Sequence, residues 1–213
     1  MGRSFEDARR WMQEGTKAFL DAIGLLHGDD WDAPSGLPSW TRRHLVAHIA
    51  ANADAVGNLV HWAATGEETP MYSSPEARAE GIEKGTRMSG GELLAWVRDS
   101  AEKLEAGMAG LTVDQWQTTV VTAQGRTVPA TETPWMRDRE IWVHLVDLAT
   151  STAFADLPED FLEALRADVA DKRGEVPEVF GTLADVTAYL AGRPYDNVAL
   201  ANGEPAPDLG PWL

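Results

Sequence analysis

Four segments of about 20 residues, in which apolar side chains recur at helical spacing, most constrain the fold of this chain. Connectors rich in glycine and proline, such as GDDWDAPSGLPSW, separate them. Amphipathic helices of this length bury their apolar faces against one another. The segments therefore predict a mainly α fold built on a four-helix bundle. Their approximate ranges are 5–27, 41–64, 91–111 and 134–151.

The connectors and the C-terminal part of the chain differ in character from these segments. TGEETPMYSSPEARAEG, after the second helix, is predicted to be a loop, and TVVTAQGRTVPATE a short hairpin or a loop. The topology of the bundle stays open. LPEDFLEALRADVADKRG and TLADVTAYLAGRP predict two shorter helices, followed by a strand-like piece and an Asn202–Gly203 turn. We therefore predict a helical bundle over residues 1–154 and a small α/β subdomain over 155–213.

Composition excludes several classes of protein. The formal net charge is −16, with 18 basic residues against 34 acidic ones and no basic run, which argues against nucleic-acid binding. An apolar run of about 18 residues is missing, so no membrane span is expected. The first residues, MGRSFEDARRW, lack an apolar signal region, which favours a cytoplasmic protein.

The absence of cysteine limits the chemistry of the chain. It removes disulfides, zinc–thiolate sites and a cysteine nucleophile together. Any bound metal must use His, Asp or Glu as ligands. Any thiol chemistry must use a thiol supplied from outside.

The fourth predicted helix, in PWMRDREIWVHLVDLATS, carries an unusual polar stripe. Thr133 is expected to cap this helix and Pro134 to occupy its first turn. At about 100° per residue, five polar side chains fall within roughly 80° of one another and are bordered by apolar ones. A solvated stripe is the ordinary interpretation, but a helix this apolar is usually buried, and buried charges need partners. The five residues are Arg137, Glu140, His144, Asp147 and Ser151.

Within this stripe, Glu140 and His144 are four residues apart, about 6 Å along the axis on one face. A carboxylate oxygen and an imidazole nitrogen can thus converge on one ion. In the second helix, TRRHLVAHIAANADAVGNLVHW, His48 is predicted to point into the bundle. A lone inward histidine is often only a satisfied core residue. Together with Glu140 and His144, however, it forms three N/O ligands of a catalytic-type metal site with an open position. His44, one turn earlier, is an alternative ligand or a second-shell residue.

The segments SWTRRHLVAHIAANADAV and REIWVHLVDLAT resemble the two ligand segments of the mycothiol-dependent maleylpyruvate isomerases, within the DinB-like metal-dependent bundle superfamily. The tail DVTAYLAGRPYDNVALANGEPAPDLGPWL resembles the end of that family's C-terminal domain. Here the region between DKRGEVPEVF and TLADV is short, so the C-terminal subdomain is expected to be shortened relative to the family.

The resemblance implies specific roles. His48, Glu140 and His144 become Zn²⁺ ligands, with His44, Arg137 and Asp147 as possible second-shell residues. The cofactor would be mycothiol or another low-molecular-weight thiol, whose thiolate adds to maleylpyruvate; the bond rotates and the thiol leaves, giving fumarylpyruvate.

The resemblance also implies that Arg193, in LAGRP, binds substrate. Arg137 or Arg139 could also hold a substrate carboxylate, because guanidinium suits that task.

Three functions stay open from the sequence. The first is this isomerase. The second is a mycothiol-dependent S-transferase that uses the same site to attack an electrophilic small molecule. The third is a non-catalytic metal-binding or partner-binding bundle in which the stripe is structural. The expected partners are a small-molecule substrate and a small thiol, and both a monomer and a dimer remain possible.

Overall fold

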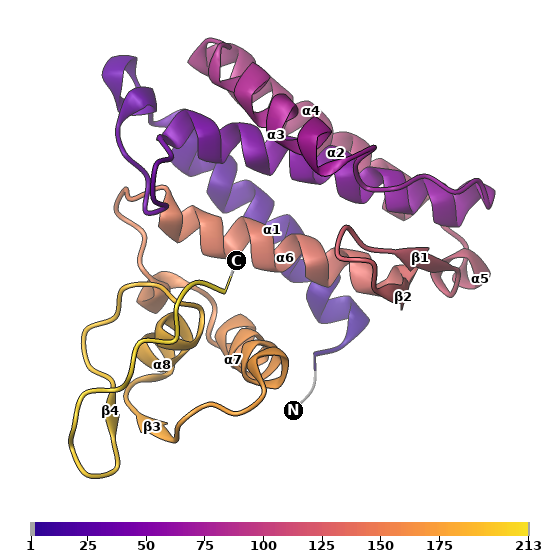
Figure 1. The fold of residues 1–213 in the computed structure, drawn as a ribbon. Helices are drawn as coiled ribbons and strands as arrows, with labels where there is room; N and C mark the ends of the chain where they lie inside the picture. Colours follow the sequence, from indigo (N-terminus) through magenta and orange to yellow (C-terminus); the bar gives the residue numbers. More distant parts are fainter. Residues whose placement is uncertain (1–2, 213) are drawn as a thin grey trace. The chain divides into compact units, whose positions relative to one another are not determined.

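The computed structural model describes residues 3–212 and contains the four predicted helices. Their bounds lie within four residues of the predicted ones. A mainly helical fold built on a four-helix bundle is thus confirmed (Figure 1). The four helices are α1 (Phe5–Gly24), α2 (Arg42–Thr65), α4 (Gly90–Ala109) and α6 (Thr133–Asp147).

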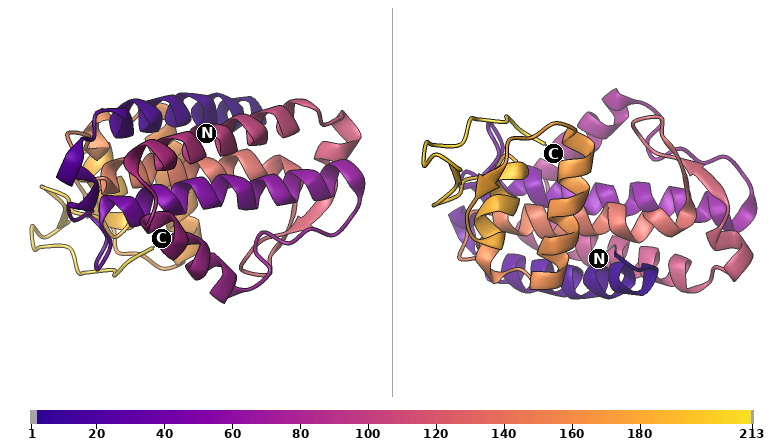
Figure 2. Two further views of the ribbon diagram at one scale, coloured as in Figure 1. Left: turned by 90° about the horizontal axis from the view of Figure 1, so that it is seen from above. Right: turned by 90° about the horizontal axis from the view of Figure 1, so that it is seen from below.

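The packing of these helices settles the topology that the sequence left open. α1 packs against α4 and α6, and α2 packs against the same two helices. The successive helices α1 and α2 are therefore diagonal to each other in the bundle. The two views of Figure 2 show the four helices running alongside one another. Because α2 is adjacent to α6, side chains from these two helices can meet inside the bundle.

The connector after α2 is not a simple loop, as had been predicted, because residues Pro75–Thr86 form a further helix, α3. Ser74 caps it by accepting a hydrogen bond from the backbone N–H of Ala77 at 3.1 Å, and Pro75 occupies the first turn. α3 packs closely on α2: a Cβ atom added at Gly85 would lie only 2.4 Å from Cβ of Ala47. The polar composition of this segment is typical of a loop, but the serine–proline pair at its start is typical of a helix N-terminus.

The connector before α6 contains the hairpin that the sequence offered as one of two possibilities. β1 (Thr119–Val121) and β2 (Thr127–Pro129) pair antiparallel, with Val120 opposite Val128. The short elements around the bundle are η1 (Gly28–Asp32), α5 (Val113–Trp116) and η2 (Ala130–Glu132).

The N-terminal end of α6 differs from the prediction. Thr133 is not the cap: Glu132 precedes the helix without a capping side chain, and the Thr133 hydroxyl donates to the carbonyl of Ala130 at 2.7 Å. The 3₁₀ turn η2 leads directly into α6. The backbone of Glu132 is therefore already helical, whereas a capping residue has an extended backbone.

The C-terminal end of α6 is set by Arg42, at the start of α2. Its Nε donates to the carbonyl of Leu148 at 2.8 Å and its Nη2 to that of Ala149 at 2.7 Å. A cation suits the free carbonyls at a helix C-terminus. Ala149 has a left-handed backbone (φ 51°), which ends the helix. Ser151 therefore lies beyond α6 and does not share the predicted polar stripe.

α6 is buried on most of its surface because α1 packs against it very closely. A Cβ atom at Gly15 would lie 2.8 Å from Cγ2 of Ile141, so only glycine allows this approach. The indole N–H of Trp142 donates to the carbonyl of Trp11 at 3.0 Å. The polar stripe of α6 therefore faces protein rather than bulk water, as its apolar borders indicated.

The described chain divides into two compact units between Thr150 and Ser151, a few residues before the predicted boundary. In the second unit, the guanidinium of Arg173 ties segments together by donating to the carbonyls of Leu190, Leu209 and Gly210. Its elements are η3 (Phe154–Asp156), α7 (Glu159–Arg173), β3 (Val179–Phe180), α8 (Leu183–Leu190) and β4 (Ala199–Leu200).

Across residues 3–212, no helix is both long enough and apolar enough to cross a membrane.

Candidate metal centre

His48 of α2 and Glu140 and His144 of α6 converge in the bundle. One ligand atom from each lies within 4.8 Å of the other two. Oε2 of Glu140 is 3.0 Å from Nε2 of His48 and 3.4 Å from Nε2 of His144. Ligand atoms arranged tetrahedrally at about 2.0–2.1 Å from a metal lie about 3.4 Å apart, so these spacings fit a divalent ion. The three residues form a candidate His–His–Glu metal site.

Two local features of the sequence build this cluster. The spacing of four puts Glu140 and His144 one turn apart on the same face of α6. His48 lies on the buried side of α2, which packs against α6. The two imidazole rings meet edge to face, with 5.1 Å between their centroids. Both helices are rigid and buried here, so the donor set is preorganised.

The electrostatics of Glu140 and His48 suit metal binding. Burial acts to raise the pKa of Glu140, but hydrogen bonds with His144 and His48 outweigh it and hold that pKa well below its usual value. Burial lowers the pKa of His48, despite the opposing effect of Glu140. An ionised carboxylate and a neutral imidazole are the forms that bind a metal.

Asp147, predicted to be a second-shell residue, contacts His144. Its Oδ2 lies 2.8 Å from Nδ1 of His144, and both side chains are buried. Burial acts to lower the pKa of His144, while Asp147 and Glu140 raise it more strongly. A carboxylate that accepts a hydrogen bond from Nδ1–H leaves the Nε2 lone pair facing the cluster. The backbone N–H of Gly36 donates to the carbonyl of Asp147 at 2.7 Å and ties the α1–α2 connector to this turn.

On the other side of the cluster, His48 faces residues that the sequence analysis did not identify. Nη2 of Arg78, on α3, lies 3.4 Å from Nδ1 of His48. Tyr72, just before α3, interacts with Arg78. Burial raises the pKa of Tyr72 overall, although Arg78 acts to lower it. The ring of Trp40 meets His48 edge to face at 5.6 Å. The capping signal SPEAR, which marks the start of α3, could have placed Arg78 on a helix next to α2.

The other predicted site residues lie outside this cluster. Nδ1 of His44 is 2.8 Å from Oγ1 of Thr41 in the cap of α2, and its ring stacks on Trp40, so His44 is not a third imidazole of the cluster. Arg137 is buried and its Nη1 donates away from the cluster, to the carbonyl of Ile49 and to Oδ1 of Asn52.

Arg193 belongs to the second unit. Its side chain is buried, and its Nη1 donates to the carbonyl of Ala191 at 3.0 Å.

Comparison with known proteins identifies the family. Residues 12–149 match the mycothiol maleylpyruvate isomerase N-terminal domain. The chain belongs to the mycothiol maleylpyruvate isomerase family. A crystal structure of the mycothiol-dependent maleylpyruvate isomerase matches at 37% identity and a TM-score of 0.91, over 99% of this chain and 98% of that one. The match thus extends over nearly the whole length of both chains.

Two further solved structures are similar. A mutant of the same isomerase, with a histidine changed to alanine, matches at 36% identity and a TM-score of 0.90, over 99% of this chain and 98% of that chain. YfiT from Bacillus subtilis, with an unusual four-helix bundle topology, matches at 19% identity and a TM-score of 0.54, over 70% of this chain and 89% of that chain. The similarity to YfiT concerns the fold alone. No curated protein matches this chain significantly.

Proposed function

We propose that this protein is a Zn²⁺- and mycothiol-dependent isomerase that converts maleylpyruvate to fumarylpyruvate. The observation that carries the proposal is the convergence of His48, Glu140 and His144 in a chain 37% identical to the mycothiol-dependent maleylpyruvate isomerase. A zinc ion held by two neutral imidazoles and one carboxylate keeps a net positive charge, which would stabilise the thiolate form of a bound thiol. Because the chain has no cysteine, that thiol comes from outside.

In this proposal, residues of α6 set the orientation and the ionisation state of the ligands. Asp147 fixes the ring of His144 with Nε2 directed toward Glu140. The Glu140 carboxylate, kept ionised, supplies the single negative charge of the donor set. A donor set with only one negative charge favours an anionic fourth ligand over a neutral one. The isomerisation itself then requires addition of the thiol to the cis double bond, rotation, and elimination.

Arg78 is our candidate for the residue that holds a substrate carboxylate. A neutral His48 that uses Nε2 as ligand atom carries its proton on Nδ1, and this N–H cannot accept a hydrogen bond from Arg78. The guanidinium at 3.4 Å then loses His48 as an acceptor and is available to a ligand, beside its interaction with Tyr72. Maleylpyruvate is a dicarboxylate, and a guanidinium binds carboxylate in bidentate geometry.

Through the family resemblance alone, we also assign Arg193 to substrate binding. Because Arg193 is buried and bonded to the carbonyl of Ala191, a loss of activity on substitution needs a control for folding. Arg193→Ala is therefore compared with Arg193→Lys by circular dichroism, zinc content and turnover. Our assignment requires both variants to fold and bind zinc while turnover falls. Full turnover in folded Arg193→Ala contradicts it.

The function is tested by zinc content and turnover of the untagged protein purified without chelators. We expect about one zinc per chain and conversion of maleylpyruvate to fumarylpyruvate only when both zinc and mycothiol are present. His144→Ala serves as the inactive control. Zinc binding without this conversion would overturn the isomerase and leave a metal-binding bundle, and absence of zinc after reconstitution would overturn the metal centre.

A further inference from the structure

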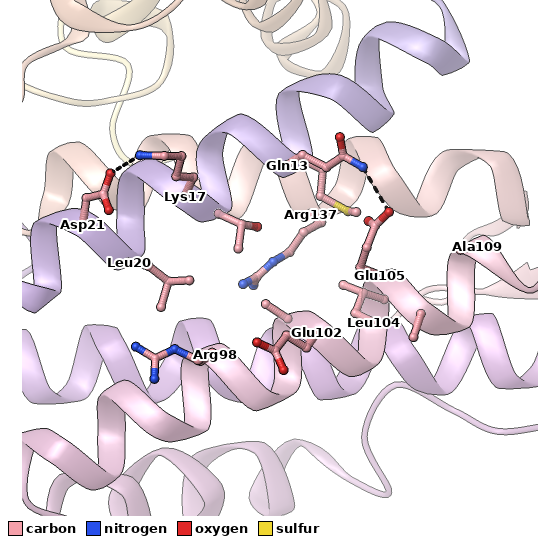
Figure 3. Close-up of a pocket in the computed structure, with 14 residues that line it drawn as sticks. Gln13, Lys17, Leu20, Asp21, Arg98, Glu102, Leu104, Glu105, Ala109 and Arg137 are labelled. Atoms are coloured by element: carbon pink, nitrogen blue, oxygen red, sulfur yellow. Dashed lines mark hydrogen bonds and ion pairs between the residues drawn. The ribbon is translucent and has the colours of Figure 1, made fainter.

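A concave site lies on the face of the bundle between α1 and α4 (Figure 3). Its volume is about 670 Å³, which is in the range of small-molecule sites. None of His48, Glu140 and His144 lines it. Much of its wall is apolar and is provided by Met12, Leu20, Ala101 and Leu104. The candidate metal centre does not account for this cavity.

The guanidinium of Arg137 points into this cavity from α6. Figure 3 shows it between Leu20 on α1 and Arg98 and Glu102 on α4. The side chain is only 1% exposed, so a bundle of apolar helices surrounds a full positive charge. Burial lowers the pKa of Arg137 to about 10, against the opposing effect of Glu140, and at this pKa the group is still protonated at neutral pH.

The hydrogen bonding of Arg137 is incomplete. Its Nη1 donates at 2.8 Å to the carbonyl of Ile49 and to Oδ1 of Asn52. Within residues 3–212, its buried Nη2 has no hydrogen-bond partner. A buried charged donor without a partner is costly, and one that faces a cavity is satisfied by an acceptor bound there. Nη2 is therefore the recognition group of the cavity.

The other charges of the wall are largely balanced. Nζ of Lys17 is 2.6 Å from Oδ2 of Asp21, and Glu105 accepts hydrogen bonds from Arg9 and Gln13. Arg98 and Glu102 are exposed side chains at the rim, where water screens them. The buried guanidinium, whose charged form Glu140 and Asp138 help to stabilise, thus keeps its Nη2 group available for an acceptor on a ligand.

We propose that this cavity is a binding site for a small monocarboxylate with an apolar body, whose carboxylate accepts from Nη2 of Arg137. The apolar part packs on Met12, Leu20 and Leu104. A monoanion fits better than a phosphate, because a single N–H₂ group is available at the base of the cavity and carboxylates nearby already stabilise the guanidinium charge. The site is distinct from the metal centre and does not depend on the function proposed for it.

The test is calorimetric titration of the full-length protein with phenylacetate and, as a neutral analogue of the same shape, 2-phenylethanol. We expect one phenylacetate per chain with a Kd on the order of 1 mM, and binding of the alcohol at least about 10-fold weaker. Arg137→Met should abolish the preference for the acid. No saturable binding of phenylacetate, or equal binding of the alcohol, would overturn the site.

Two further variants keep the test decisive if Arg137→Met does not fold. Ala101→Phe fills the cavity and should abolish binding, whereas Ala95→Phe, on the same helix but outside the cavity, should not. His144→Ala should retain binding, because the metal centre is not involved. Binding that survives Ala101→Phe, or that is lost with His144→Ala, would show that phenylacetate binds elsewhere and would overturn the proposal.

Discussion

Nε2 of His48 lies 3.0 Å from Oε2 of Glu140, although 92 residues of chain separate these two side chains. The contact exists because α2 and α6 are neighbours in the bundle, while α1 and α2, consecutive in sequence, are diagonal. A buried imidazole on one helix and a half-buried carboxylate on the other are thus brought within hydrogen-bond distance.

His48→Ala should remove stoichiometric metal binding, because two protein ligands remain where a stable site needs three. The matched control is His61→Ala, on the same helix but exposed, which should bind metal as the unaltered protein does. Metal content by mass spectrometry after dialysis measures both. One equivalent of metal in folded His48→Ala would contradict the assignment of this residue.

Asp147→Asn should weaken metal binding without abolishing it. The amide no longer holds the Nδ1 proton of His144 as a carboxylate does, and loss of such a partner typically costs about 10- to 100-fold in metal affinity. Competition with a chromophoric chelator measures the change. An affinity within about twofold of the unaltered protein would show that Asp147 does not orient the ligand.

Much of this site was accessible from sequence because its determinants are local. A spacing of four on a helix fixes the relation between Glu140 and His144, and the apolar borders of the stripe indicated that it is buried. The inward position of His48 followed from the same periodicity. What periodicity alone did not provide was the pairing of α2 with α6, which depends on contacts distant in sequence.

Other features depend on contacts that the sequence does not reveal. Arg137 shares the helical face of Glu140, but a long side chain need not end where its Cα lies, and its guanidinium instead reaches Ile49 and Asn52. Ser151 was assigned to the stripe because nothing in its own neighbourhood reveals that Arg42, from another helix, binds the carbonyls at the end of α6. The sequence does not place Arg78 near the site, because the polarity and proline of this helix are also typical of a loop.

Arg78→Met should lower kcat/KM for maleylpyruvate while leaving metal content unchanged. Loss of one charged hydrogen bond to a substrate carboxylate corresponds to roughly a 10- to 100-fold decrease. Arg87→Met, at the exposed C-terminal end of the same helix, is the control and should have normal kinetics. Equal kinetics for the two variants would remove Arg78 from the substrate site, and loss of metal would assign it a structural role.

Two alanine substitutions in α3 should change stability in opposite directions. At Gly85 the new Cβ would lie 2.4 Å from Cβ of Ala47, so Gly85→Ala forces α3 away from α2 and should cost roughly 1–3 kcal/mol of unfolding free energy. At Gly81 no atom lies within 4 Å, so Gly81→Ala should stabilise by about 0.5–1 kcal/mol through helix propensity. Urea unfolding measures both.

Because α3 carries Arg78, the Gly85→Ala variant also tests whether the position of α3 matters for function. Displacing α3 from α2 should increase the separation between Arg78 and His48, which is now 3.4 Å. We expect a raised KM for maleylpyruvate in folded Gly85→Ala and an unchanged KM in Gly81→Ala. An unchanged KM in both, together with the predicted loss of stability in Gly85→Ala, would show that substrate binding does not require α3 to pack closely on α2.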